Sequence, residues 1–152
     1  MNAVFTKLNY KAQAEVVVLN APEEFLSLLT ELTSQAIIVH DPEQIQQGEF
    51  IIAFVKKQQE VIDLVPLLAS RLQGDGILWF AYPKGSSRKY TCNFNRDTGW
   101  VVLEKYGFAG VRQVAIDEDW SALRFRRVEY IKKMTRQRSQ AMTDQGKAKL
   151  VQ

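Results

Sequence analysis

The sequence predicts a three-layer α/β domain built on a mostly parallel sheet, with an antiparallel hairpin at one edge. Short apolar runs rich in β-branched residues recur along the chain, as is typical of strands buried on both faces. Segments with apolar residues at helical spacing lie between these runs, which indicates crossover connections and parallel strands. The last two runs are separated only by a short turn, which favours an antiparallel pair.

The first half of the chain begins with a strand, a tight turn and a helix. Residues 15–20 (EVVVLN) predict a buried strand. Pro22 suits the first turn of a helix, and Glu23 and Glu24 suit the positive end of its dipole. Two further strands are predicted at 36–39, before His40 and Asp41, and at 50–55.

The second half continues the alternation and then ends in the hairpin. Residues 56–73 predict a helix, and the interior Pro66 predicts a kink or a short break near Asp63. The remaining predicted elements are a strand at 77–82, a loop at 84–95, a helix at 97–106 capped by Gly107, strands at 111–116 and 121–128, and a helix from about 128 to 142.

Length and charge indicate one domain with a basic tail. The domain is expected over residues 8–142, and residues 143–152 are expected to form a disordered basic tail. Residues 129–152 carry six Lys or Arg residues against two acidic residues, a net charge of +4 in a chain whose total is +3. Cys92 is the only cysteine, and the sequence shows neither a signal peptide nor a membrane span, so a cytoplasmic location is expected.

Any ligand site is expected at the carboxyl edge of the sheet, because open parallel sheets bind ligands beyond the carboxyl ends of their strands. The loop after the fourth strand, PKGSSRK, offers cations and hydroxyls suited to an anion. Trp120, in the turn of the hairpin, could stack on a planar ligand or cover the end of the sheet. The candidate ligand-binding residues are Asn20, Pro22, Lys84, Ser86, Ser87, Asp117, Trp120 and Ser121.

The turn after the first strand argues against nucleotide cofactors. It reads NAPEEF and contains no glycine, whereas a dinucleotide site needs a glycine-rich turn. Glu23 and Glu24 also place negative charge where a phosphate would bind. No cofactor is therefore predicted, and S-adenosylmethionine is disfavoured.

Catalytic and metal-binding groups are sparse. His40 is the only histidine and has no nucleophile near it in sequence, so no catalytic residue is predicted. Arg88 and Lys89 could lower the pKa of Cys92, but no partner base accompanies this thiol. A single histidine and a single cysteine also argue against zinc, and no metal site is predicted.

Two family resemblances follow from these motifs. The run from FIIAFV to ILWFAYPK, with the closing segment AIDEDWSALRFRRV, resembles the methyltransferase-like variant of the Rossmann-like fold. The segments VVVLNAPEEF, GILWFAYPKGSS and AIDEDWSALRF resemble a bacterial family, domain of unknown function number three thousand and fifty-two. This second resemblance implies a small cytoplasmic protein with a degenerate methyltransferase-like fold and no assigned reaction.

The sequence favours a non-catalytic domain that binds a small anionic ligand or a partner at the carboxyl edge. One alternative is a nucleic-acid-associated protein that uses the basic C-terminal tail, through which protein contacts could also form. A second alternative is a divergent S-adenosylmethionine-dependent methyltransferase. The expected partners are a small anion, nucleic acid or protein at the tail, and a second copy in a homo-oligomer; no membrane contact is expected.

Overall fold

The computed structural model describes residues 3–94 and 99–131. Its strands form one six-stranded sheet in the order β2-β1-β3-β4-β6-β5. The strands are β1 (Glu15–Leu19), β2 (Ile37–Val39), β3 (Phe50–Phe54), β4 (Ile77–Pro83), β5 (Phe108–Ala115) and β6 (Trp120–Arg127). The helices are α1 (Ala3–Lys7), α2 (Glu23–Leu26), α3 (Gln58–Arg71) and α4 (Val101–Lys105), with 3-10 helices at Ser27–Leu32 and Pro42–Gln44.

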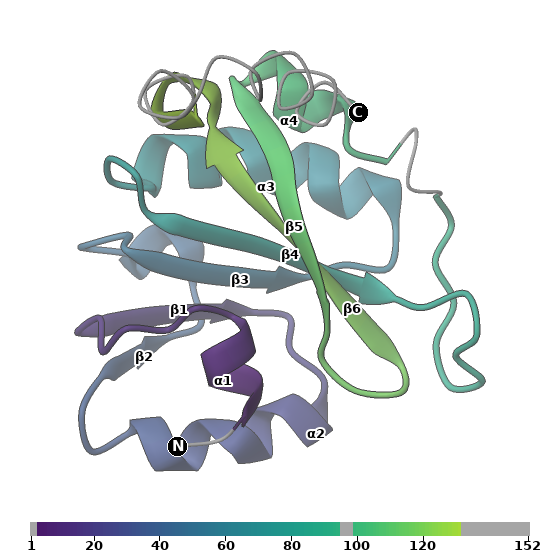
Figure 1. The fold of residues 1–152 in the computed structure, drawn as a ribbon, viewed down its shortest axis with the longest axis horizontal. Coiled ribbons are helices and arrows are strands. Elements are labelled where there is room, and N and C mark those ends of the chain that lie inside the picture. The colour runs from purple at the N-terminus through teal and green to yellow at the C-terminus, as the bar shows by residue number, and fades with distance from the viewer. Residues whose placement is uncertain (1–2, 95–98, 132–152) are drawn as a thin grey trace, which may run out of the picture.

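Four parallel strands and an antiparallel hairpin make up the sheet. The strands β2, β1, β3 and β4 are parallel neighbours. Strand β6 pairs with both β4 and β5 and is antiparallel to each. It therefore lies between them, although it is the last strand in the sequence. The predicted α/β class, with a mostly parallel sheet and an antiparallel edge hairpin, is therefore confirmed (Figure 1).

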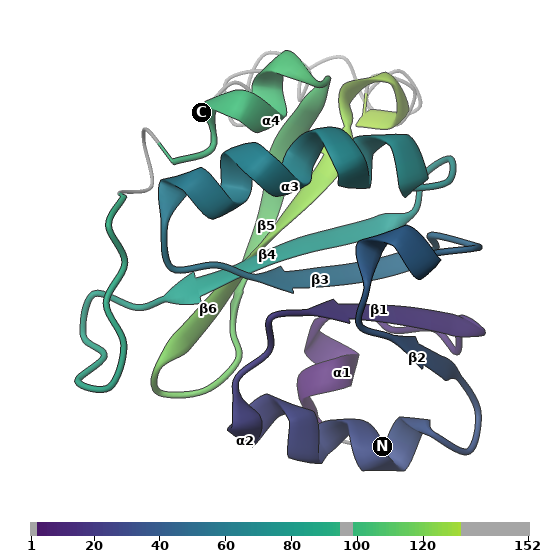
Figure 2. The same cartoon turned by 180° about the vertical axis from the view of Figure 1, so that it is seen from behind.

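Helices cover both faces of this sheet and complete the three layers. Helices α3 and α4 lie on one face, and α1 and α2 lie on the other (Figures 1 and 2). Alternate side chains of β4 enter different cores: Phe80 packs in the core under α3, and Trp79 packs in the core with Phe5 of α1 and Phe25 of α2. The strands are thus apolar at nearly every position because both of their faces are buried.

Several elements differ from the sequence-based expectation. Helix α3 is continuous through Pro66, so the break expected near Asp63 is wrong. Pro66 is on the exposed side, while Val61, Val65 and Leu68 are buried, and their burial offsets the cost of the proline. The predicted helix after Glu23 is one α-helical turn that continues as a 3-10 helix to Leu32.

The ends of the domain also differ. Helix α1 was not predicted, yet Phe5 is buried and the Trp79 indole Nε1 donates to the Leu8 carbonyl at 2.8 Å, so packed structure begins before residue 8. Helix α4 begins at Val101, later than expected, and β5 begins at Phe108, earlier than expected. The last predicted helix begins at Val128, but residues 132–142 and the tail at 143–152 lie outside the described residues. No helix in the described ranges is long and apolar enough to cross a membrane.

Candidate functional site

The sheet contains one point at which the direction of winding reverses. From β1 the chain moves outward to β2, and it then returns to the other side of β1 to form β3. The carboxyl ends of β1 and β3 are therefore adjacent, while the chain leaves β1 toward one face of the sheet and leaves β3 toward the other face. Open α/β sheets bind ligands at such a switch point.

The turn after β1 bends without a glycine. Asn20 adopts a left-handed conformation with φ of 58°, which asparagine tolerates better than most residues. Pro22 follows with φ of −70° and is the N-cap residue of α2, although no side chain caps this helix. The turn therefore directs Glu23 and Glu24 to the carboxyl edge, as the sequence predicted.

The loop after β4 is fastened to the turn between β5 and β6. The Lys84 backbone N–H donates to the Asp119 carbonyl at 2.8 Å, and the Ser87 hydroxyl donates to the Asp119 carboxylate at 2.9 Å. The same Ser87 oxygen accepts the backbone N–H groups of Lys89 and Tyr90. These bonds fold the loop back, so that Tyr90 faces the sheet edge instead of solvent.

The hairpin turn is organised by its own polar groups. The Asp117 carboxylate accepts the backbone N–H groups of Asp119 and Trp120, each at 2.8 Å. Trp120 is only 2% exposed, and its ring lies 5.1 Å from that of Phe54 and 5.0 Å from that of Tyr90. Ser121 is buried opposite Tyr82. Trp120 thus covers the end of the sheet, which was one of its two predicted roles.

A charged cluster surrounds Tyr90 at the switch point. The Tyr90 hydroxyl donates to the Glu24 carboxylate at 2.9 Å, and the Lys89 ammonium lies 3.7 Å from the other Glu24 oxygen. The ammonium groups of Lys56 and Lys89 lie 5.6 Å and 5.5 Å from the centre of the Tyr90 ring. We call Glu24, Lys56, Lys89, Tyr90 and Trp120 the carboxyl-edge cluster; it joins the loops that follow β1, β3 and β4 to the start of β6.

The ionisation of this cluster is coupled. The pKa of Glu24 is lowered, chiefly by a hydrogen bond from its own backbone. Burial is the next largest effect and opposes this shift, while the hydrogen bond from Tyr90 and the charge of Lys89 add to it. The pKa of Lys89 is raised, chiefly by the Glu24 carboxylate. The pKa of Tyr90 is raised by burial and by its hydrogen bond to Glu24. At neutral pH the cluster therefore holds the Glu24 carboxylate, the Lys89 ammonium group and the neutral Tyr90 phenol.

Two polar side chains follow β2, the strand next to β1. His40 Nδ1 lies 3.1 Å from the Val18 carbonyl oxygen, which can only accept, so Nδ1 carries a proton in this contact and Nε2 faces away from it. The Asp41 carboxylate accepts the Glu43 N–H at 2.9 Å and caps a 3-10 helix. One Asp41 oxygen and His40 Nε2 thus have no described partner and can accept from a ligand.

Cys92 is not an activated thiol. Burial raises the pKa of Cys92, and its Sγ donates to the Phe94 carbonyl at 3.4 Å. Arg88 and Lys89, whose charges could have lowered this pKa according to the sequence, do not contribute to the raised pKa of Cys92. Cys92 therefore packs as a half-buried apolar side chain.

Seven of the eight predicted site residues fall into two groups. The first group lies where the loop after β4 joins the hairpin turn and consists of Lys84, Ser87, Asp117, Trp120 and Ser121. Asn20 and Pro22 lie on the loop after β1, which the structure links to the first group through Glu24 and Tyr90. Ser86 is exposed in the loop after β4. The ligand-binding role of these residues stays a prediction.

The central residues of the cluster, Glu24 and Tyr90, were not among the predicted site residues. The sequence offered one signal for Tyr90: it is the only aromatic residue that precedes Cys92 in the polar loop KGSSRKYTCNFN. Its partner is 66 positions away, so no local spacing could connect them.

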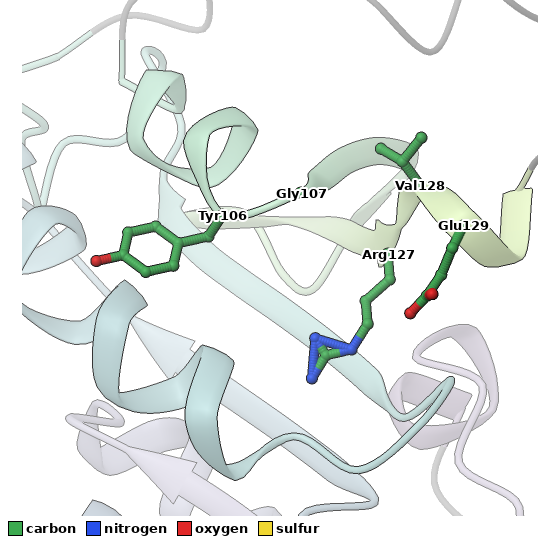
Figure 3. Close-up of a pocket in the computed structure, with 5 residues that line it drawn as sticks. All are labelled: Tyr106, Gly107, Arg127, Val128 and Glu129. Atoms are coloured by element: carbon green, nitrogen blue, oxygen red, sulfur yellow. The ribbon is translucent and has the colours of Figure 1, made fainter.

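The amino edge of the sheet carries a hollow of about 460 Å³ lined by Tyr106, Gly107, Arg127, Val128 and Glu129. Figure 3 shows the Arg127 side chain extending from the end of β6, with Val128 turned the other way. The Arg127 guanidinium donates to the carbonyls of Ala69, Leu72 and Gly74, which binds β6 to the end of α3. The guanidinium group of this hollow is therefore engaged in structural bonds. No cluster of metal-ligating side chains occurs in residues 3–94 and 99–131.

Two solved structures show the same fold. A methyltransferase from Aquifex aeolicus that depends on S-adenosylmethionine aligns with a TM-score of 0.52 over 81% of this chain and 87% of its own, at 10% identity. The fibrillarin pre-rRNA processing protein of Methanococcus jannaschii aligns with a TM-score of 0.51 over 76% of this chain and 67% of its own, at 14% identity. The chain therefore has a Rossmann-like, methyltransferase-like fold. No family model and no curated protein matches the sequence.

Proposed function

We propose that this protein is a divergent S-adenosylmethionine-dependent methyltransferase that binds its cofactor at the carboxyl edge of the sheet. The observation that carries the proposal is the carboxyl-edge cluster, which places charged and aromatic groups at the switch point of a methyltransferase-like fold. The glycine-free turn after β1 disfavoured this ligand in the sequence, whereas the cluster, which only the structure reveals, supplies groups that complement it.

The charge of the turn after β1 distinguishes between cofactors. Glu23 and Glu24 oppose a pyrophosphate, and the Glu24 carboxylate is stabilised by a hydrogen bond from its own backbone and further by Tyr90 and Lys89. S-adenosylmethionine has no phosphate; it carries a sulfonium and an ammonium group against one carboxylate and is a net cation. The residues present therefore fit this ligand better than a dinucleotide.

The charged groups of the ligand and its ribose have complementary groups at this edge. Glu24 would bind the ammonium group, Lys56 and Lys89 the carboxylate, and the Tyr90 ring would lie against the sulfonium. The free oxygen of Asp41 would accept from a ribose hydroxyl, as acidic residues after the second strand do in related folds. When bound, the cofactor supplies a methyl group, and His40 Nε2 can accept the proton that a methyl acceptor loses.

Isothermal titration calorimetry with S-adenosylmethionine and its demethylated product tests the proposal. Glu24→Gln should weaken binding of S-adenosylmethionine at least tenfold, a loss of about 1.4 kcal/mol. Glu104→Gln, which removes one exposed carboxylate from α4, is the matched control and should bind as the unmodified protein does. An absence of binding at millimolar ligand, or equal affinities for the two variants, would contradict the proposal.

A non-catalytic anion-binding domain is the second candidate. The observation that favours it is the loop after β4, where no ion pair to Lys84 or Arg88 is seen among the described residues, while Glu24 is paired with Lys89. A thermal-shift series separates the candidates: stabilisation by phosphate or sulfate that is lost in Lys84→Ala supports the anion site. Stabilisation by adenosyl ligands alone supports the methyltransferase. Membership of the domain-of-unknown-function family is part of either proposal and rests on the three sequence motifs.

A further inference from the structure

Three arginines lie on one face of the hairpin, away from the carboxyl-edge cluster. Arg112 of β5 is paired directly with Arg124 of β6, and Arg126 is two residues further along β6. Because side chains alternate along a strand, all three project from the same face. That face is the one covered elsewhere by α1, since Arg124 pairs on its other side with the buried Trp79.

The three arginines differ in their partners. Arg126 forms a two-point ion pair with Asp75, its Nε donating to one carboxylate oxygen at 2.8 Å and its Nη2 to the other. Arg124 Nε is buried without a hydrogen-bond partner in the described part of the chain. Arg112 is exposed, and no hydrogen bond or ion pair to it is seen within that part.

This arrangement is unfavourable for the protein alone. Like charges directly opposite each other on paired strands destabilise a sheet. The pKa of Arg124 is lowered by burial first, and then by the positive charges of Arg126 and Arg112, with Asp75 opposing. Within residues 3–94 and 99–131, Asp75 is the one carboxylate that acts on Arg124, and it is already paired with Arg126, so a ligand could supply further negative charge to Arg112 and Arg124.

We propose that Arg112 and Arg124, with Arg126 beside them, bind the phosphodiester backbone of a single-stranded nucleic acid. Guanidinium groups bind phosphate oxygens through paired N–H donors. Arg124 and Arg126 are separated by about 7 Å along β6, a distance comparable with that between successive phosphates of an extended strand. Arg112 is exposed and Arg124 and Arg126 are half-buried beside it, so several phosphates of one strand can bind together here, where a single free phosphate would be held weakly.

The site is independent of the proposed cofactor site. It uses other residues, and it lies on the hairpin face and not on the loops at the carboxyl edge. It also differs from a role of the basic tail, because the arginines belong to two described strands.

Fluorescence anisotropy of a labelled oligothymidylate of about 20 nucleotides tests the proposal over a series of salt concentrations, using the full chain. Each lost phosphate contact should reduce the slope of log affinity against log salt by about 0.7. Arg112→Gln, an exposed substitution, should lower the slope by that amount, and Arg112→Gln with Arg124→Gln by about twice as much. Lys105→Gln removes one exposed cation from α4 and should leave the slope unchanged.

Three results would overturn the proposal. The first is that the slopes of Arg112→Gln and Lys105→Gln are equal, or that the oligonucleotide does not bind. The second is that inorganic phosphate competes at the same concentration as nucleotide phosphate, which would indicate a site for a free anion. The third is that vesicles of anionic phospholipid bind with the same dependence on Arg112, which would indicate a lipid headgroup. Circular dichroism melting of each variant verifies that the fold is intact.

Discussion

The two edges of the sheet use their charged residues differently. At the amino edge, the buried Glu15 carboxylate accepts backbone N–H groups from Gln46, Gln47 and Gly48, at 3.1, 3.0 and 3.0 Å. Arg127, at the same edge, donates to three backbone carbonyls. At the carboxyl edge, Glu24 bonds instead to the side chains of Tyr90 and Lys89, which lie on an exposed loop.

This difference separates structural charges from those available to a ligand. Backbone partners are fixed by the fold, so Glu15 and Arg127 cannot exchange them without local unfolding. Side chains at the carboxyl edge can rotate to new partners at little cost, since exposed ion pairs contribute little to stability. The comparison therefore predicts that substitutions at the amino edge change stability, whereas substitutions at the carboxyl edge change binding.

The largest effect is expected for Glu15→Ala. The substitution leaves three backbone N–H groups without their acceptor in a buried place, each at a cost of about 1–3 kcal/mol. We expect a loss of at least about 3 kcal/mol in the free energy of unfolding, measured by urea denaturation. Glu24→Ala is the matched carboxylate at the other edge and should lose less than about 1 kcal/mol. Similar losses of unfolding free energy in the two variants would contradict the proposed difference between the two edges.

The second largest loss of stability is expected for Gly48→Ala, with Gly85→Ala as its control. Gly48 has φ of 56°, and a Cβ added there would lie 2.0 Å from the Arg71 carbonyl oxygen, so Gly48→Ala forces the backbone to shift. We expect a loss of about 2–3 kcal/mol from strain and overpacking. A Cβ added at Gly85, in the loop after β4, meets no atom within 4 Å, so Gly85→Ala should change stability by less than about 0.5 kcal/mol. Thermal melts of the two variants measure the difference.

The smallest effect is a change in ionisation without a change in fold. The pKa of Tyr90 is raised partly by the Glu24 carboxylate, so Glu24→Gln should lower the pKa of Tyr90 toward its ordinary value. Tyr10, whose pKa is raised by burial alone, is the internal control and should not respond. Carbon-13 NMR titration of labelled tyrosine rings follows both residues. An unchanged pKa for Tyr90 would show that Glu24 and Tyr90 are not coupled in solution.

The sign of the pH dependence follows from these shifts. The lowered pKa of Glu24 contributes stability above its unfolded value, which is lost as pH falls through the folded value. The raised pKa values of Tyr90 and Lys89 contribute stability below their unfolded values, which is lost as pH rises through the folded values. The cluster is therefore intact between these limits, which include neutral pH.

The sequence was most informative where burial acts on a continuous segment. The runs EVVVLN and FIIAFV predicted β1 and β3 within one residue, because a strand buried on both faces must be apolar throughout. Helix α1 was missed because five residues are too few to show a helical repeat. The carboxyl edge was predicted as the site region from topology alone, and the loops after β1 and β4 do lie there.

Contacts between distant residues were beyond the sequence. From the sequence, Glu24 was assigned to the dipole of its helix, and Lys89 to a loop whose cations and hydroxyls suit an anion. Their ion pair, and the bond from Tyr90, depend on how Ser87 and Asp119 fold the loop after β4. The pairing of Arg112 with Arg124 similarly depends on a register shift between Gly110 and Arg112, which no pattern in β5 indicates.

The most direct test of the division between the two edges is an NMR titration of the labelled protein with S-adenosylmethionine. We predict that the resonances of the carboxyl edge shift, foremost those of Asn20, Asp41, Lys56 and Tyr90. The resonances of Gln47, Gly48 and Arg127 at the amino edge should not move. Shifts confined to the amino edge, or an unchanged spectrum at millimolar ligand, would contradict the assignment of ligand binding to the carboxyl edge.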